Sequence, residues 1–252
     1  MPRPVAADPA WVLHDWASAL VPRICAGCRR GGGPLCRRCR ALLGGRPADA
    51  VLSPAPEGMP RTVAASAYEG PVREAVVAFK DHGRWSLREP LGRALAASVA
   101  VLLEPSPGWR AVLVPVPGSP GSSRRRDGDH VHELASVAAR HLRRAGVVVA
   151  VRHAVVPVRR RRDQVGLGRD ERAANLEGAV AAAGWAPALA GCTVVLVDDL
   201  VTTGATLAAC ARALAGAGAP VAGAAVVAAA SKGLRVSSAP RALPDSRATF
   251  VL

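Results

Sequence analysis

The stretch that decides the fold is residues 194–207, which read VVLVDDLVTTGATL. Four apolar residues precede two adjacent aspartates, and threonines with a glycine separate the aspartates from a second apolar segment. A continuous apolar stretch of this kind is typical of a strand covered on both faces, as in a parallel sheet. The stretch therefore predicts a buried strand over 193–197, a tight loop, and a helix over 205–215.

The loop after this strand has the chemistry of a phosphate site. Backbone amides at a helix N-terminus, together with threonine hydroxyls, bind a phosphate dianion, and Gly204 allows the backbone to approach closely. Asp198 and Asp199 suit the hydroxyls of a sugar or a Mg²⁺ ion with its waters. A phosphate at one end and a vicinal diol at the other describe a ribose 5-phosphate. We assign to the 5′-phosphate Thr202, Thr203, Gly204, Ala205 and Thr206.

Two alternatives compete with this assignment. A plain strand–turn–helix, in which the aspartates only cap the helix, needs fewer assumptions but explains less of the pattern. A P-loop is excluded, because the chain contains no Gly-x4-Gly-Lys-Ser/Thr sequence.

Further apolar segments alternate with turns from about residue 61 onward. Strands that alternate with helices indicate a parallel sheet with crossover connections, which places the chain in the α/β class. Asp129 has the position of an N-cap for the helix that follows it. The predicted strands are 61–69, 111–115 and 221–229, the predicted helices are 71–80, 87–103 and 130–145, and shorter apolar segments cover 147–158 and 179–183.

Four of the six cysteines are concentrated in the first sixty residues, as Cys25, Cys28, Cys36 and Cys39. A Cys-x2-Cys turn directs two thiolates at one tetrahedral metal, so two such turns complete a four-sulfur Zn²⁺ site with no open position. Such a site is structural and not catalytic. The alternative is a pair of disulfides, which is disfavoured in a cytoplasmic chain.

The composition sets the domain organisation and removes several classes. In 252 residues with a net charge of +14, half the residues are hydrophobic, which excludes wholesale disorder. We expect an N-terminal segment over 1–60 with a zinc ribbon at 25–39, a main domain over 61–230, and a loose tail over 231–252. Neither a signal peptide nor a membrane span is recognisable, so we expect a cytoplasmic protein.

The central stretch resembles the phosphoribosyl-pyrophosphate (PRPP) signature of type I phosphoribosyltransferases. The chain from about 20 to 230 also resembles the ComF family of competence-protein F-like proteins, which join an N-terminal zinc ribbon to a phosphoribosyltransferase-like domain. Besides the cysteines and the Asp-Asp-Thr-Thr-Gly loop, the matching pieces are Tyr68-Glu69-Gly70, Phe79-Lys80, Val114-Pro115-Val116-Pro117, Gln164, Arg169, Arg172 and Asn175-Leu176-Glu177-Gly178-Ala179.

This resemblance implies a type I phosphoribosyltransferase-like parallel sheet flanked by helices, with Asp198 and Asp199 catalytic and Mg²⁺ bound together with PRPP. It also implies a pyrophosphate loop after Pro117 and a hood over 157–172 that closes over PRPP. The arginines it assigns to pyrophosphate are Arg124, Arg125, Arg126, Arg169 and Arg172. The chain departs from the family at Arg126-Asp127-Gly128-Asp129-His130, where the family has Arg-Gly-aromatic-Asn-Gln. We interpret Lys80 as a surface helix end and not as a pyrophosphate contact.

Three functions fit the sequence. The first is transfer of phosphoribose from PRPP to an unidentified acceptor, with release of pyrophosphate; the partner could also be a phosphoribosylated nucleotide. The second, by family resemblance, is a non-catalytic accessory protein of competence and DNA uptake that binds single-stranded DNA and meets a helicase or uptake proteins. The third is a PRPP-binding regulator without catalysis. Residues 111–175 hold 13 arginines and 6 acidic residues, half of the net charge, which favours a phosphorylated small molecule over DNA.

Overall fold

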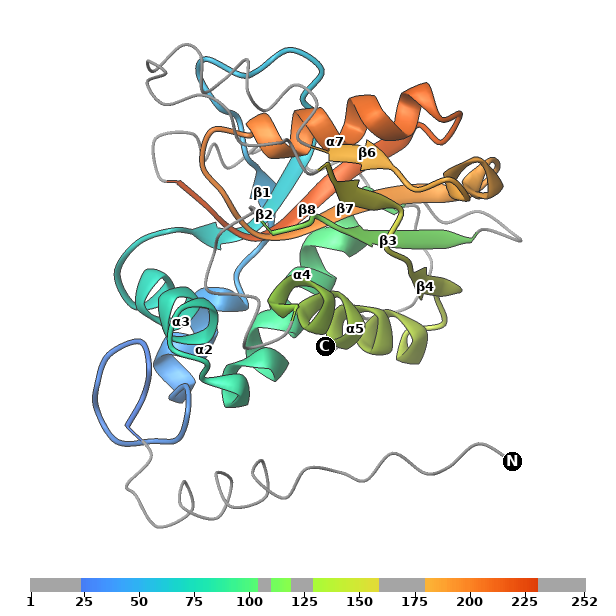
Figure 1. The fold of residues 1–252 in the computed structure, drawn as a ribbon. Helices are drawn as coiled ribbons and strands as arrows, with labels where there is room; N and C mark the ends of the chain where they lie inside the picture. The colour runs from blue at the N-terminus through green and yellow to red at the C-terminus, as the bar shows by residue number, and fades with distance from the viewer. Residues whose placement is uncertain (1–23, 104–109, 119–128, 159–179, 231–252) are drawn as a thin grey trace, which may run out of the picture.

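The computed structural model describes residues 24–103, 110–118, 129–158 and 180–230 (Figure 1). Six strands form a central sheet in the order β1-β2-β8-β7-β3-β4. β1 pairs with β2 in antiparallel fashion, and all the other neighbouring strands of this sheet are parallel. The strands are β1 (Ala48–Asp49), β2 (Thr62–Ala67), β3 (Ala111–Pro115), β4 (Val149–Val151), β7 (Thr193–Val201) and β8 (Val221–Ala229), with β5 (Val155–Pro157) and β6 (Val180–Ala182) pairing separately. The helices are α2 (Arg37–Leu43), α3 (Gly70–Lys80), α4 (Arg88–Leu102), α5 (His130–Arg144) and α7 (Ala205–Gly216), with single 3₁₀ turns η1 (Trp85–Leu87) and η3 (Ala186–Leu189).

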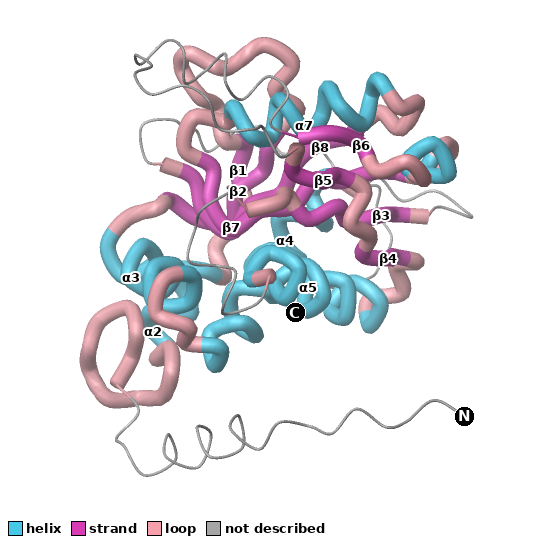
Figure 2. Tube along the Cα trace, viewed as in Figure 1, coloured by secondary structure: helices cyan, strands magenta, loops and turns pink. Residues whose placement is uncertain are grey.

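Helices cover both faces of the sheet, which forms the middle layer in Figure 2. The helices α3, α4 and α5 lie on one side and α7 on the other (Figure 1). In β7, Val195 and Val197 pack into the core beneath α4 and α5, whereas Val194 and Leu196 pack into the core beneath α7. Burial on both faces explains the continuous apolar segment, and the predicted α/β class is confirmed.

The helices α4 and α5 pack so closely that their contact requires a glycine. A Cβ atom at Gly92 would lie 2.5 Å from Val137 Cβ, which no real contact allows. The predicted N-cap of α5 is confirmed, since the Asp129 carboxylate accepts a hydrogen bond of 2.9 Å from His132 N. The start of α5 is therefore fixed where the chain arrives from β3.

Two predicted segments differ from the observed elements. We expected the strand to end at Val197, but β7 continues to Val201, because Asp198 and Leu200 pair with β8. The two aspartates therefore lie within the strand and not after it. The apolar segment 147–158 forms two strands in different sheets, since β4 pairs with β3 and β5 pairs with β6.

The N-terminal segment, of which residues 24–60 are described, contributes a strand to the central sheet. The short strand β1 pairs with β2, and the Arg61 guanidinium lies 2.8 Å from the Asp49 carboxylate beside that pairing. The predicted tail, 231–252, lies outside the described residues. Within the described ranges, no helix combines the length and the apolar character that crossing a membrane requires.

Candidate functional site

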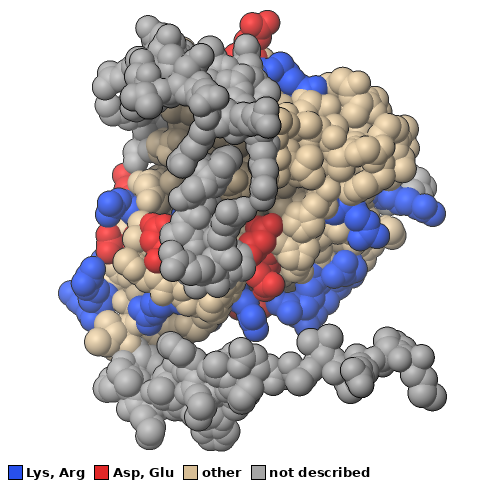
Figure 3. All heavy atoms as spheres, in the orientation of Figure 1, with Lys and Arg blue, Asp and Glu red and all other residues tan. Residues whose placement is uncertain are grey.

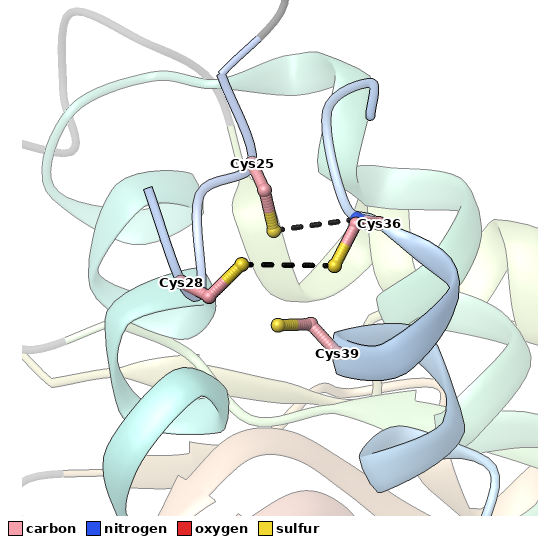
Figure 4. A group of neighbouring side chains, drawn as sticks. All are labelled: Cys25, Cys28, Cys36 and Cys39. Carbon is pink, nitrogen blue, oxygen red and sulfur yellow. Dashed lines mark hydrogen bonds between the residues drawn. The ribbon is translucent and has the colours of Figure 1, made fainter. Parts of the chain in front are cut away.

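Cys25, Cys28, Cys36 and Cys39, called here the four-cysteine cluster, converge between a loop and the start of α2. Figure 4 shows the four side chains directed toward one another. Their Sγ atoms all lie within 4.8 Å of one another, and Cys28 Sγ is 3.7 Å from Cys36 Sγ. A tetrahedral zinc ion with Zn–S bonds of about 2.3 Å places its sulfurs roughly 3.8 Å apart. The cluster therefore fits a structural Zn²⁺.

The same geometry argues against the disulfide alternative. All six cysteines are free thiols, and a separation of 3.7 Å far exceeds the roughly 2.05 Å of an S–S bond. The cluster instead has the dimensions of a metal site.

The thiols of Cys25 and Cys39 have different proton affinities. Burial opposes ionisation of Cys25, but backbone N–H groups, including that of Cys36 at 3.3 Å, outweigh it and lower the pKa of Cys25 to about 6. Burial raises the pKa of Cys39 far above its ordinary value, and neighbouring thiols raise it further. Four thiolates therefore need a cation among them, which is the chemistry that Zn²⁺ supplies.

The four-cysteine cluster packs on the first turns of α3. A Cβ atom at Gly27, between the first two cysteines, would lie 2.9 Å from Pro71 Cβ. The Arg29 guanidinium lies 3.4 Å from the Glu74 carboxylate. Because Gly27 has no side chain, the loop between Cys25 and Cys28 can pack directly against α3.

The second site contains Asp198, Asp199 and the loop residues 202–206, and is called here the carboxylate–threonine site. The Asp199 side chain is 3% exposed, and its carboxylate lies 2.9 Å from the ammonium nitrogen of Lys80. Our interpretation of Lys80 as a surface helix end is wrong, because the ammonium group ends on this buried carboxylate. Lys80 is the last residue of α3, and its bond to Asp199 connects this helix to β7, 119 residues further along the sequence.

A compositional signal could have identified Lys80. The chain has 33 lysines and arginines, of which only Lys80 and Lys232 are lysines. A lysine in a chain that otherwise uses arginine stands out in the sequence, and Lys80 is therefore a residue to relate to the two aspartates.

Asp198 has a different environment from Asp199. Burial raises the pKa of Asp198 well above its ordinary value, and the charge of Asp199 raises it further, against the opposing effect of the Asp199 N–H and Lys80. On the side of α7, burial and the charge of Asp198 raise the pKa of the Cys210 thiol to about 12. The single positive charge of Lys80 thus lies near two carboxylates, and the negative charge that it does not offset suits a cation or sugar hydroxyls.

The loop between β7 and α7 presents the groups expected for a phosphate. The side chains of Thr202 and Thr203 are exposed, and α7 begins immediately after Gly204. Gly204 has φ +76°, and a Cβ atom there would lie 2.5 Å from Met59 Sδ. The loop needs a glycine for its backbone conformation and for the cover that the segment before β2 provides. Sequence reasoning missed Met59, which carries no pattern of its own.

The end of β3 lies next to the aspartates. Pro115 pairs with Val197, and Val116 N donates to Val197 O at 2.9 Å, so the segment after β3 leaves the sheet beside Asp198. On the other side, Val155 of β5 and Val180 of β6 pack with Leu207 of α7. The described residues therefore place the start of the predicted pyrophosphate loop next to Asp198, and they place the two strands that flank the predicted hood against α7. The five predicted arginines lie outside the described residues, namely Arg124, Arg125, Arg126, Arg169 and Arg172.

A comparison with models of protein families finds a match to part of the chain. Residues 133–242 match the model of the phosphoribosyl transferase domain. The matched region contains Asp198, Asp199 and the loop residues 202–206, but neither the four-cysteine cluster nor Lys80. A search of curated proteins finds no match to the chain. The chain thus combines a region similar to the phosphoribosyl transferase domain with the four-cysteine cluster of its N-terminal region.

Proposed function

We propose that this protein is a phosphoribosyltransferase of the ComF type, which transfers the 5-phosphoribosyl group of PRPP to an acceptor and releases pyrophosphate. The observation that carries the proposal is the carboxylate–threonine site itself. Two aspartates lie near the carboxyl end of a buried parallel strand, which is followed by a threonine–glycine loop and a helix N-terminus. This is the edge of an α/β sheet at which such folds bind ligands.

In this proposal the two ends of the site hold the two ends of the phosphoribosyl group. Backbone amides at the start of α7 and the hydroxyls of Thr202, Thr203 and Thr206 bind the 5′-phosphate. Asp198 accepts hydrogen bonds from the ribose hydroxyls or binds the waters of Mg²⁺, which neutralises charge on the pyrophosphate when it is bound.

The transfer step itself asks little of the protein beyond position and charge. The bond between ribose C1 and the pyrophosphate oxygen breaks, its electron pair leaves with pyrophosphate, and a lone pair of the acceptor forms the new bond to C1. Because the ribose becomes oxocarbenium-like, the protein must stabilise the leaving group with cations and exclude water. We assign the first task to Arg124, Arg125, Arg126, Arg169 and Arg172, whose guanidinium groups bind phosphate bidentately.

The four-cysteine cluster has a structural part in this proposal. Its four thiolates leave a bound Zn²⁺ no open position for substrate, and the cluster packs on α3, away from the threonine loop.

Single-stranded DNA is the second candidate ligand, together with the role in competence that the family resemblance implies. Figure 3 shows basic side chains gathered on the side of the molecule where α5 ends and β4 lies. There Arg143 and Arg144 at the end of α5 and Arg152 after β4 are exposed. Stacking aromatics are scarce there, because α5, β4 and Arg152 contain no tryptophan, tyrosine or phenylalanine. Trp85 is half-buried and has His130 stacked on its ring at 4.8 Å between centroids. PRPP therefore ranks first.

Isothermal titration with Mg²⁺-PRPP tests the proposal. The wild-type protein should bind, and Asp198→Asn should lose most of the affinity because a neutral amide cannot replace the carboxylate toward Mg²⁺. Asp81→Asn is the matched control, since it removes an exposed carboxylate just after α3. Absence of binding to the wild type, or equal binding by Asp198→Asn, contradicts the proposal. A DNA shift assay at low and high salt tests the second candidate, whose binding must weaken with salt.

A further inference from the structure

We propose that Lys80 is a positioning residue of the carboxylate–threonine site: it binds Asp199 in a buried ion pair and so leaves Asp198 as the carboxylate that meets the ligand. This inference rests on the proposed function. It divides between the two aspartates the tasks that the sequence assigns to both.

The first argument is geometric. The Lys80 ammonium lies 2.9 Å from each oxygen of the Asp199 carboxylate. The Asp199 side chain is 3% exposed, against 22% for Lys80. A carboxylate enclosed to this degree and bound to a cation is closed to a ribose hydroxyl or a hydrated Mg²⁺ that arrives from solvent, although its Oδ2 accepts no hydrogen bond within the described part of the chain. Asp198, which is half-buried, is the one of the two that a ligand can reach.

The second argument is electrostatic. Two adjacent carboxylates in a poorly solvated place repel each other, and the repulsion favours uptake of a proton by one of them. Lys80 offsets the charge of Asp199, so that the two aspartates and the lysine together carry a single negative charge. The site can then hold one ionised carboxylate beside a ligand that is itself an anion.

The third argument concerns how firmly Lys80 is held. Phe79, the preceding residue, is fully buried and meets the rings of Trp85 and His130 edge-on, at 5.6 Å and 5.3 Å between centroids. At the other end of α3, Pro71 is packed against Gly27 of the four-cysteine cluster's first turn. A helix fixed at both ends delivers the ammonium to one place, which is what a positioning residue needs.

The experiment is a double-mutant cycle on the Kd for Mg²⁺-PRPP. Its variants are Lys80→Met, Asp199→Asn and the double variant. Lys80→Arg is the conservative replacement, and Arg88→Met, which removes an exposed basic side chain at the start of α4, is the matched control. Each protein is first shown to be folded by circular dichroism and by a melting temperature well above the titration temperature. The double variant carries no unpaired buried charge, so it remains informative if Lys80→Met is poorly folded.

If Lys80 acts through Asp199, each single variant weakens binding by about tenfold or more, and the double variant is within about threefold of the weaker single one. Lys80→Arg recovers much of the lost affinity, because it keeps the charge, whereas a role in stability alone would leave the Kd of every folded variant unchanged.

Other results overturn the inference. Effects of the two single variants that multiply in the double variant would mean that Lys80 touches the ligand directly. Wild-type affinity in Lys80→Met would mean that it has no role in binding. If the wild-type protein itself fails to bind Mg²⁺-PRPP, the proposed function fails and this inference fails with it; in the other cases the proposed function stands.

Discussion

The four-cysteine cluster and the carboxylate–threonine site lie at opposite ends of α3 and are assembled in different ways. The cluster takes all four ligands from fifteen consecutive residues, 25–39, whose own turns bring the thiols together. The carboxylate–threonine site takes its aspartates from β7, its lysine from α3 and its cover from Met59. The ligands of the cluster therefore come from one local segment, whereas the other site requires α3 and β7, which are far apart in the sequence, to lie together.

The difference has consequences for what each site tolerates. In the four-cysteine cluster the ligands are chemically equivalent, so removal of any one opens the metal centre. In the carboxylate–threonine site the residues have unequal tasks, and removal of the side-chain charge is expected to lower stability at Asp199 and to raise it at Asp198. The predictions below test this contrast, beginning with the largest effect.

Loss of a cluster ligand is expected to cost the most. Cys28→Ser should reduce bound zinc from about one ion per chain to a small fraction and lower the melting temperature strongly, because a structural Zn²⁺ contributes on the order of 10 kcal/mol in isolated zinc fingers. Metal analysis and calorimetry measure both. Cys192→Ser, outside the cluster, should change neither. Full zinc content in Cys28→Ser would refute the assignment.

Breaking the buried ion pair comes next. Asp199→Ala leaves the Lys80 ammonium without its partner, and the unfolding free energy should fall by about 2–3 kcal/mol, below the ~3–5 kcal/mol of a fully buried pair. The reduction follows from the 22% exposure of Lys80. Asp49→Ala breaks the exposed pair with Arg61, at 2.8 Å, and should cost less than about 1 kcal/mol. Denaturant unfolding compares them, and equal losses would mean that the Lys80–Asp199 pair is not effectively buried.

A smaller effect is expected at the threonine loop. Gly204→Ala combines a strained backbone, at φ +76°, with a Cβ contact of 2.5 Å to Met59 Sδ, so about 2 kcal/mol of stability should be lost. Gly218 has φ +78° and open space around its Cβ position, so Gly218→Ala should show the backbone cost alone, about 1 kcal/mol. In a Met59→Ala background, where only the 3.0 Å contact with Leu52 Cδ1 remains, the further cost of Gly204→Ala should approach the Gly218→Ala value. If that further cost stays as large as in the wild-type background, contact with Met59 is not the cause.

The smallest effect has the opposite sign. Since the folded state raises the pKa of Asp198 above its unfolded value, the folded state binds more protons than the unfolded one as the pH rises above about 3.9. Stability contributed by this group is therefore greatest at low pH and is lost as the pH rises toward the folded pKa. Asp198→Asn removes this loss, so at pH 7 the variant should be more stable than wild type by about 1 kcal/mol, while at pH 3 the two should be similar. Thermal unfolding at the two pH values measures it; a variant less stable at pH 7 contradicts the unequal roles of the aspartates.

The sequence predicts well the features that depend on neighbours along the chain. The Cys-x2-Cys spacing, the Asp129 cap and the β7–loop–α7 order all follow from local rules. The length of β7 does not, because it is extended by pairing with β8, and no local signal shows how far that pairing runs. The contact between Lys80 and Asp199 joins two residues that are 119 positions apart in the sequence, so no local rule predicts it. The rarity of lysine in the chain is the one sequence feature that singled out Lys80.

The central claim is that the carboxylate–threonine site holds PRPP by its two ends, and a crystal structure of the full chain with Mg²⁺-PRPP tests it most directly. We expect the 5′-phosphate at the N-terminus of α7, within hydrogen-bond distance of the backbone amides and hydroxyls of residues 202–206. We expect the ribose hydroxyls or hydrated Mg²⁺ beside Asp198, and Asp199 still bound to Lys80. PRPP bound elsewhere, or a 5′-phosphate away from the threonine loop, would contradict the account.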